Sequence, residues 1–416
     1  MTQEKALEVL KTGANVFLTG EPGSGKTFTI NKYIAWLEER GRYAEVTAST
    51  GIAATHINGS TIHSWCGIGT KSHITDEEIE QILSKPWVIK KLAGARVLII
   101  DEISMLNAQM IEDVDRILSV ANNTVWDGTP FGGLQVIFVG DFYQLPPVSK
   151  EKKKPSSFAF EAKAWESAKP VICYLTEQHR QSDPLFLEIL TALRQSTLTE
   201  KHISVLNKHV RRPKEGEQIT KLYTHNKDVD AINAFELSKI KAEQHEFEMI
   251  GTGIPALIEA LKRSCISPEI LKLKKGALVM FTRNKFIDDE TIYVNGTIGT
   301  VVGFENGRPV VETKDGKEIL VEPATWEIKE KNKVLASITQ IPLRLAWAIT
   351  VHKSQGMSLD AAMMDLSKAF EFGQGYVALS RVRSLEGLYL VGFNEQALKM
   401  HPKVIIKDAE FRNQQL

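Results

Sequence analysis

The sequence predicts an α/β protein with two cores of parallel strands and crossover helices, and a small β-rich domain inserted into the second core. Three observations lead to this prediction. A glycine-rich phosphate-binding pattern follows an apolar strand near the N-terminus, and short apolar runs then alternate with helical patterns. Residues 270–340 change to short β-rich segments separated by Asn-Gly and Asp-Gly turns. At 416 residues the chain is long enough for about three domains.

The phosphate-binding pattern is the segment Gly20–Thr27, which has a glycine, four free positions and then Gly-Lys-Thr. An apolar run precedes it and an amphipathic helical pattern follows it. Backbone N–H groups of such a loop surround a polyphosphate, Lys26 reaches the outer phosphates, and the Thr27 hydroxyl can hold Mg²⁺. The alternative is a glycine-rich turn that matches the pattern by chance.

Five apolar runs in the first part of the chain are typical of buried parallel strands, and each ends in a polar or glycine-rich turn. They are 16–19, 44–48, 97–100, 135–139 and 171–174. Ligands of open parallel sheets bind beyond the carboxyl ends of the strands, so we expect these turns to line one cleft.

Two of these turns carry side chains suited to nucleotide hydrolysis. The third strand ends in Asp101 and Glu102, which places one carboxylate where it can hold Mg²⁺ and the next where it can polarise a water. The fourth strand leads to Gln144 just before paired prolines, so this amide occupies a constrained turn and can sense a γ-phosphate. Solvated acids and a rigid turn are the alternatives.

The turn after the second strand has small residues that let a phosphodiester backbone approach closely. Thr50 and Gly51 begin it, and His63 and Trp65 follow with a hydrogen-bonding group and a stacking face. A helix cap followed by a core tryptophan explains the same residues nearly as well. The position beside the phosphate loop favours DNA contact.

The second half returns to the α/β pattern after the β-rich segments. An apolar run from Leu345 opens into a polar turn between Thr350 and Gln355, where the dense hydrogen-bonding side chains suit phosphates and bases. A helix face formed by Phe372, Tyr376 and Leu379 then leads to Arg381, which can stabilise charge on a transferring phosphoryl group.

Composition excludes several classes of protein. Fifty-one basic residues balance 51 acidic ones, so only a local groove would attract a polyanion. The three cysteines, Cys66, Cys173 and Cys265, form no CxxC pair, which argues for small core residues rather than a disulfide framework or zinc site. We find no membrane-spanning run and no signal-peptide pattern, so we expect a soluble cytoplasmic protein, nucleoid-associated if prokaryotic.

The ordered set of motifs resembles the Petite Integration Frequency (PIF) family of superfamily 1B DNA helicases, close to the RecD type. The segments that carry this resemblance are GEPGSGKT, STGIAA, GSTIHSW, LIIDEISML, VGDFYQLPPV, LTEQHRQ, AWAITVHKSQGMSLD and YVALSRVRS, between about Ala14 and Phe393. The resemblance implies two RecA-like P-loop NTPase cores and an SH3-like β-barrel. The expected domains are 1–175 with a short wedge insertion at 66–84, 176–269 with 341–400, the barrel at 270–340, and a tail at 401–416.

The resemblance also implies a set of site residues. Catalysis would depend on Lys26, Asp101, Glu102, Gln144 and two arginine fingers, Arg180 and Arg381, with the metal on Thr27 and Asp101. ATP would contact Gln3, which resembles the family's adenine-reading glutamine, and Gly23, Ser24, Gly25, Lys26, Thr27 and Phe28. Single-stranded DNA would lie along Thr50, Gly51, His63, Thr350, His352, Lys353 and Gln355.

The function implied is an ATP- and Mg²⁺-dependent helicase that moves 5′ to 3′ on single-stranded DNA and unwinds forked, R-loop or G-quadruplex DNA. Genome maintenance, repair, recombination and telomere maintenance are the expected settings. One alternative is a DNA-stimulated ATPase clamp that binds single-stranded DNA without progressive unwinding. Another is an oligomeric ATPase whose arginine finger comes from a neighbouring subunit. We expect a monomer, with a DNA-induced dimer as the alternative.

Overall fold

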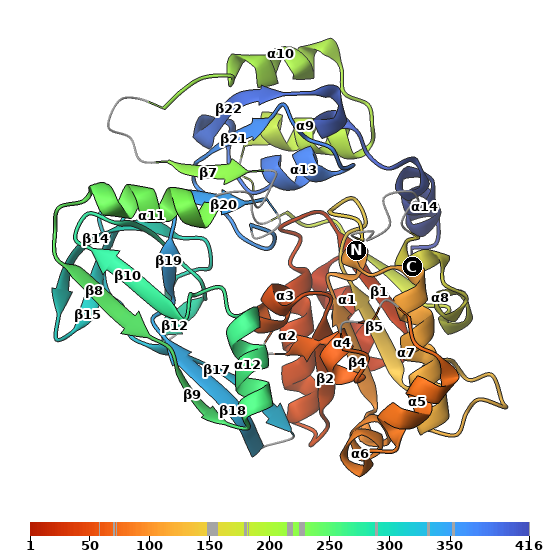
Figure 1. Cartoon of the computed structure of the whole chain (residues 1–416). Coiled ribbons are helices and arrows are strands. Elements are labelled where there is room, and N and C mark those ends of the chain that lie inside the picture. The colour runs from red at the N-terminus through yellow and green to blue at the C-terminus, as the bar shows by residue number, and fades with distance from the viewer. Residues whose placement is uncertain are drawn as a thin grey trace. The chain divides into compact units, whose positions relative to one another are not determined.

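The computed structural model describes the chain except residues 58, 70, 72, 148–156, 179–180, 182, 214–218, 224–228, 288–289, 331–332, 352–353 and 416. It forms two compact units (Figure 1). Unit 1 comprises residues 1–179 and 402–416, and unit 2 comprises residues 180–401. Each unit is described by itself below.

Unit 1 is built on a six-stranded parallel sheet with the order β3-β2-β4-β5-β1-β6. The strands are β1 (Val16–Gly20), β2 (Ala44–Ala48), β3 (Ser60–Thr61), β4 (Val97–Asp101), β5 (Gln135–Val139) and β6 (Val171–Leu175). The five longer strands coincide with the predicted runs to within one residue. Buried apolar side chains specify them, because a parallel strand is covered on both faces.

The helices of unit 1 connect these strands. They are α1 (Gln3–Lys11), α2 (Lys26–Glu38), α3 (Gly51–His56), α4 (Ile62–Trp65), α5 (Asp76–Leu83), α6 (Pro86–Gly94), α7 (Ala108–Ala121) and α8 (Lys163–Ala168), with 3₁₀ turns η1 (Ile103–Met105), η2 (Pro130–Gly133) and η3 (Ala159–Glu161). Leu10 of α1 and Ile30, Tyr33 and Leu37 of α2 pack into the core formed with β1, β4, β5 and β6. This packing fixes the start of α2 directly after β1.

The predicted wedge segment contains α5 and is attached to α7 by a buried carboxylate. Asp113 is fully buried, and its Oδ1 lies 2.9 Å from His73 Nδ1 and accepts hydrogen bonds from Gln109 and Arg116. Arg116 also donates to Ile74 O at 2.9 Å and pairs with Asp76. The stretch from His73 to Asp76 is thereby held on α7.

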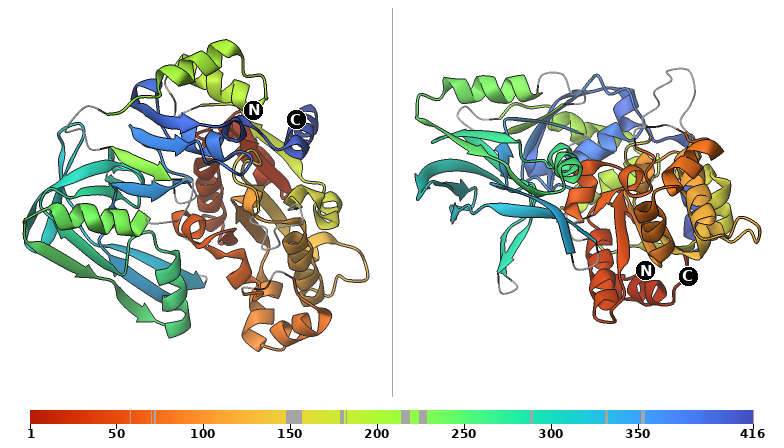
Figure 2. Two further views of the ribbon diagram at one scale, coloured as in Figure 1. Left: turned by 45° about the horizontal axis from the view of Figure 1, so that its top comes forward. Right: turned by 60° about the horizontal axis from the view of Figure 1, so that its bottom comes forward.

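The C-terminal helix α14 (Pro402–Asn413) packs into unit 1, although it lies in the segment 401–416 that the sequence analysis expects to be a tail. Phe411 is 3% exposed, and the Tyr174 hydroxyl of β6 lies 3.2 Å from Asp408 Oδ1. The N-terminal amine and the Gln415 side chain both donate to the Tyr174 carbonyl. Both chain ends accordingly lie near each other in every view (Figures 1 and 2).

Unit 2 contains a four-stranded parallel sheet with the order β20-β7-β21-β22. Its strands are β7 (Thr220–Tyr223), β20 (Ala348–Thr350), β21 (Ala362–Leu366) and β22 (Leu388–Phe393). Its helical elements are α9 (Pro184–Arg194), α10 (Glu200–Lys208), α11 (Val229–Lys239), α13 (Gln374–Leu379), η4 (Leu385–Gly387) and η5 (Glu395–Leu398). In α11 the buried residues are Val229, Asn233 and Leu237, while Phe235 is exposed.

Residues 244–345 of unit 2 form an antiparallel β-domain. Its strands are β8 (Gln244–Glu248), β9 (Ile250–Gly253), β10 (Ile270–Lys274), β11 (Leu278–Phe281), β12 (Lys285–Ile287), β13 (Glu290–Tyr293), β14 (Ile298–Glu305), β15 (Arg308–Thr313), β16 (Glu318–Leu320), β17 (Ala324–Glu330), β18 (Lys333–Gln340) and β19 (Leu343–Leu345), with α12 (Pro255–Ser264) between β9 and β10.

The β-domain extends beyond the expected range 270–340 at both ends. Strand β8 pairs with β10, β9 pairs with β18, and β19 pairs with β11. The apolar run expected as one strand from Leu345 is therefore divided between β19 of the β-domain and β20 of the parallel sheet. Charged residues alternate along β8, which weakens its apolar pattern and hides it from sequence analysis.

Candidate functional site: a phosphate loop at the carboxyl edge of the first sheet

The phosphate loop lies where β1 meets α2, and its glycines are required by its geometry. Gly25, the N-cap of α2, has φ +87° and ψ +20°, a left-handed conformation that glycine adopts without steric cost. Gly20 is at φ +149°, and a Cβ there would lie 2.6 Å from the Leu175 carbonyl oxygen of the neighbouring strand. Glycine is therefore required at both positions for the loop to leave β1 in this conformation.

Side chains around the loop are suited to an anionic ligand. Lys26 Nζ donates to Gly20 O at 2.7 Å and to Glu21 O at 3.1 Å, so its ammonium lies over the loop. The Ser24 hydroxyl is buried and has no hydrogen-bond partner among the described residues, so an incoming ligand can satisfy it. Thr27 and Phe28 are exposed at the start of α2. Ser24, Lys26, Thr27 and Phe28 all belong to the predicted ATP-binding set, which stays a prediction.

Gln3 lies on the same loop although it is far from it in sequence. Its Nε2 donates to Ser24 O at 3.3 Å, and its backbone N–H donates to Glu177 Oε2. A Cβ on Gly25 would approach Gln3 Nε2 to 2.1 Å, so the amide lies directly against the glycine. Helix α1 thus positions Gln3 beside the loop.

Asp101 is the last residue of β4, the second neighbour of β1 in the sheet, and Glu102 follows it. The Glu102 N–H donates to Asp101 Oδ1 at 2.8 Å. Burial raises the pKa of Asp101 to about 6, against the opposing effects of this hydrogen bond and of the Lys26 charge. Glu102 has φ +52° and ψ +46°, a left-handed conformation that costs a non-glycine residue about 1 kcal/mol and is typical of functional positions.

Gln144 lies in a turn whose backbone is fixed by Asp141. The fully buried Asp141 accepts a hydrogen bond from the Tyr143 N–H through Oδ1, and its carbonyl accepts one from the Gln144 N–H at 2.9 Å. Gly140 begins the turn at φ +153°. A Cβ on this residue would lie 3.0 Å from the Ile103 backbone nitrogen, which is a tight contact. The Gln144 side chain is 6% exposed, in keeping with the constrained position predicted from the paired prolines.

The residues predicted to face DNA in unit 1 lie at the start of α3 and in α4. The Thr50 hydroxyl accepts from Ala53 N as the N-cap of α3, Gly51 begins that helix, and His63 is half-buried in α4. Trp65 is only 4% exposed, and its indole N–H donates to Glu45 Oε2 at 2.7 Å. The stacking role considered for Trp65 is therefore wrong, since the ring is part of the core.

In unit 2, Arg381 is held by short-range hydrogen bonds. It is 1% exposed, its Nε donates to Val377 O at 2.8 Å, and Nη2 donates to Ser380 Oγ at 2.8 Å. Its Nη1 reaches Ser354 O at 3.4 Å, in the turn that also contains Thr350 and Gln355, both buried. The structure thus brings Arg381 and this turn together. Three predicted residues lie outside the described residues: Arg180, His352 and Lys353.

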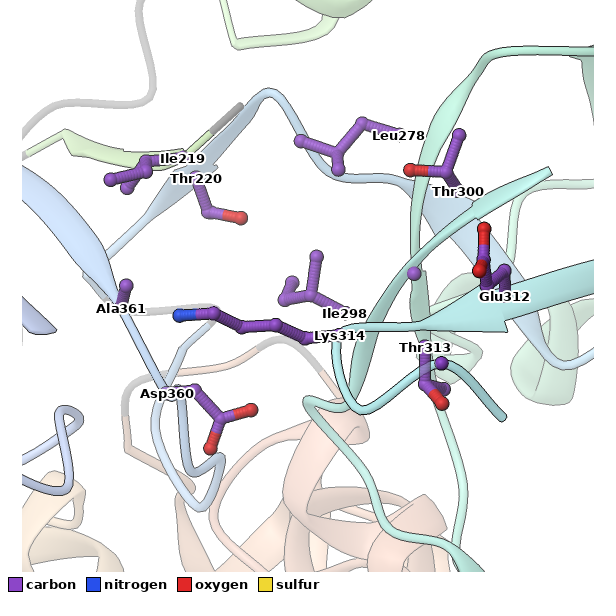
Figure 3. A pocket seen from close by; sticks show the side chains of 12 residues that line it. Ile219, Thr220, Leu278, Ile298, Thr300, Glu312, Thr313, Lys314, Asp360 and Ala361 are labelled. Carbon is purple, nitrogen blue, oxygen red and sulfur yellow. The ribbon is translucent and has the colours of Figure 1, made fainter. Parts of the chain in front are cut away.

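Unit 2 also contains a cavity of about 510 Å³ where the β-domain meets the amino-terminal edge of the parallel sheet (Figure 3). Thr220 begins β7 and Ala361 precedes β21, so this edge is opposite the one that carries Thr350. Lys314 projects into the cavity, and carboxylates of Asp360 and Glu312 lie on its walls. Among the described residues that line the cavity, none is aromatic. One cation between two carboxylates forms neither a phosphate cradle nor a stacking face.

Sequence analysis missed Glu21, Glu177 and Gln178 as supports of the loop. Gln178 Nε2 donates to Glu21 Oε2 at 2.8 Å, and Glu177 accepts from the Gln3 N–H. Glu177 and Gln178 follow β6, which is the neighbour of β1. Their position after that strand could have indicated a place beside the phosphate loop.

No cluster of three or more metal-ligating His, Cys, Asp or Glu side chains occurs among the described residues. Within the same part of the chain, no helix has the length and apolar character needed to cross a bilayer.

Comparison with known proteins identifies the family. A model of the PIF1-like helicases matches residues 2–209, and a model of the DNA helicase Pif1 2B domain matches residues 256–304. The ATP-dependent DNA helicase Pif1 of Psychrobacter sp. (strain PRwf-1) is 40% identical over 474 residues, covering 99% of this chain and 71% of that protein. The chain belongs to the PIF1-like helicase family.

Other PIF1-like helicases extend the comparison. The Xenopus laevis ATP-dependent DNA helicase PIF1 is 37% identical and covers 97% of this chain, which spans 63% of that relative's length. The crystal structure of Bacteroides sp. Pif1 in complex with ADP-AlF4 has a TM-score of 0.85 at 31% identity, covering 99% of this chain and 96% of that one. Bacteroides Pif1 in complex with ADP-AlF3 and single-stranded DNA has a TM-score of 0.67 at 31% identity and the same coverage. Together with the two parallel sheets and the β-domain of this chain, the similarity to these solved structures confirms the predicted fold class.

Proposed function

We propose that this chain is an ATP-dependent DNA helicase that moves 5′ to 3′ along single-stranded DNA and unwinds duplex DNA ahead of it. The observation that supports this most is the phosphate loop at the carboxyl edge of the first sheet, with Asp101, Glu102 and Gln144 on the same edge, in a member of the PIF1-like helicases. The names of the relatives supply the DNA substrate.

Each residue of the loop has a role in the proposal. The loop N–H groups and Lys26 hold the β- and γ-phosphates, because the N-terminus of α2 and the ammonium both favour anions. The buried Ser24 hydroxyl gains a partner when the phosphates bind. Gln3, held against Gly25, hydrogen-bonds the adenine edge.

The donor set at this edge fits a hard divalent cation. The Thr27 hydroxyl and the Asp101 carboxylate are oxygen donors of the kind that Mg²⁺ prefers, and the ion usually keeps several waters besides. When bound, Mg²⁺ neutralises charge on the transferring phosphoryl group. Glu102 orients and deprotonates the attacking water, and its left-handed backbone fixes the direction of its side chain.

The remaining predicted residues link hydrolysis to DNA. Gln144 senses the γ-phosphate, and Arg381 and Arg180 stabilise transition-state charge as arginine fingers. Thr50, Gly51 and His63 of unit 1, and Thr350, His352, Lys353 and Gln355 of unit 2, contact the strand. Opening one base-pair step costs about 1.4 kcal/mol of stacking, so hydrolysis of one ATP per nucleotide supplies ample free energy.

The test is strand displacement with duplexes that carry either a 5′ or a 3′ single-stranded tail. We expect ATP-dependent unwinding of the 5′-tailed duplex only, while a Lys26→Ala variant binds the tail but does not unwind. Unwinding of the 3′-tailed substrate would contradict the proposed direction. Tight binding with DNA-stimulated hydrolysis but no unwinding of either substrate would favour a clamp instead. Hydrolysis whose turnover number rises with protein concentration would indicate an oligomeric ATPase.

A further inference from the structure

We infer that the C-terminal helix α14 is a positioning element for the Gln144 turn and acts through the ring of Phe411. This inference rests on the proposed role of Gln144 as γ-phosphate sensor. None of the residues of α14 belongs to the motifs that identify the family's catalytic machinery, so their contribution to hydrolysis is a separate question.

Phe411 lies in a buried cluster of aromatic rings in unit 1. Its ring centroid is 5.0 Å from that of Phe17 and 6.3 Å from those of Phe142 and Trp165. The rings of Phe142 and Phe411 are nearly parallel, with an interplanar angle of 24°. Phe142 and Phe411 are at most 5% exposed, so a loss of either ring leaves a gap that water does not fill easily.

Phe142 belongs to the same turn as Gln144. The turn's backbone is fixed at Asp141, whose side chain and carbonyl accept hydrogen bonds from the N–H groups of Tyr143 and Gln144. Its aromatic side chain is fixed by packing with Phe17, Phe158, Phe160, Trp165 and Phe411. A shift of Phe142 therefore moves the backbone two residues before the Gln144 amide.

A partly buried polar network fixes the position of α14 itself. Asp408 is 7% exposed and accepts from Arg412 Nε at 2.8 Å, and Arg412 Nη2 donates to the Tyr174 hydroxyl at 2.7 Å. The Arg412 guanidinium lies 4.5 Å from the centroid of the Tyr174 ring. At the other end of the helix Lys403 pairs with Glu161. Because these contacts fix α14 near both of its ends, they hold Phe411 in one position against Phe142.

The test compares Phe411→Leu with Ile406→Ala in the full chain. Ile406 is 65% exposed on the same helix, so its truncation is a matched control that changes no buried contact. We expect Phe411→Leu to lower kcat for DNA-stimulated ATP hydrolysis about tenfold, because sub-ångström displacement of a positioned group is sufficient for such a loss. Ile406→Ala should leave kcat unchanged.

Ligand binding distinguishes positioning of the sensor from general damage. ADP has no γ-phosphate, so its affinity for Phe411→Leu should match that of the wild type. The affinity for ADP with aluminium fluoride, which mimics the transferring phosphoryl group, should fall by the same factor as kcat. If the affinity for ADP fell in parallel, the substitution would have disturbed the phosphate loop through Phe17, and the inference would be wrong.

A double-mutant cycle with Gln144 gives the second criterion. Single-turnover hydrolysis is measured for Gln144→Ala, Phe411→Leu and the combined variant, at a temperature well below the unfolding transition of each. If Phe411 acts through Gln144, its substitution adds no further loss in the Gln144→Ala background. Equal losses in both backgrounds would overturn the inference. A wild-type protein without DNA-stimulated hydrolysis would instead refute the proposed function, so the two failures are distinguishable.

Discussion

Replacing Asp113 tests whether the His73–Asp76 stretch must be held on α7 for unwinding. The carboxylate is fully buried, with His73 at 2.9 Å, Arg116 at 3.1 Å and Gln109 at 3.2 Å from Oδ1. Asp113→Ala removes the acceptor that these three side chains share. Breaking a buried charged network in this way typically costs about 3 to 5 kcal/mol. We expect the lower end, about 3 kcal/mol, because Arg116 keeps its bonds to Ile74 O and Asp76.

The assays are urea unfolding and a comparison of two activities. Because the substitution loosens the segment that carries α5, we expect unwinding of a forked duplex to fall about tenfold, while hydrolysis stimulated by single-stranded DNA stays near the wild-type value. Asp113→Asn keeps the shape and one acceptor oxygen, so it should cost about 1 to 2 kcal/mol. Glu80→Ala removes a charge from the exposed face of α5 and is the matched control.

Two results would refute this reasoning. Unchanged unwinding by Asp113→Ala, with the expected loss of stability, would show that the tethered segment has no part in strand separation. An equal fall in unwinding and in hydrolysis would show that the carboxylate supports the nucleotide site instead.

Three further predictions concern the nucleotide site and the thiols. Glu102→Gln should lower the single-turnover hydrolysis rate at least about 100-fold while ATP binding persists, and normal turnover would exclude Glu102 as the base. Gly25→Ala forces a left-handed alanine and displaces the Gln3 amide, so it should lower the free energy of unfolding by about 1 kcal/mol, as measured by thermal unfolding. The same variant should show a smaller preference for ATP over GTP. An unchanged preference would argue against adenine recognition by Gln3. Burial raises the pKa of Cys66 to about 12 and that of Cys173 to about 11, so both thiols should resist alkylation of the native protein at pH 8 and react only after unfolding, as measured by mass spectrometry.

The sequence was sufficient for the five longer strands of the first sheet and for the phosphate loop, because local patterns determine them. Buried strands such as β4 and β5 are uninterrupted apolar runs, and the loop between β1 and α2 requires glycine where φ is positive. The wedge attachment through Asp113 is different in kind, since nothing in a lone aspartate on a helix indicates which distant side chains it binds.

Long-range packing explains the other differences. Trp65 was ambiguous because a tryptophan in this setting suits a stacking face and a core position equally, and its burial together with the hydrogen bond to Glu45 decides for the core. The docking of α14 escaped prediction because its apolar residues form a weak helical pattern. Phe131 has φ +52° and donates its N–H to Asp115, a conformation that its neighbours impose and that an aromatic residue does not adopt by preference.

The helix α14 makes unit 1 discontinuous in the polypeptide. The chain leaves this unit after residue 179 and enters it again at residue 402, so the intervening 180–401 is topologically an insertion with both ends tethered to its host. A single cut in either connection leaves the second unit attached by the other one. Expression of residues 1–179 alone would omit the Phe411 ring from the aromatic cluster, so a minimal version of the first unit needs the two stretches fused or supplied together.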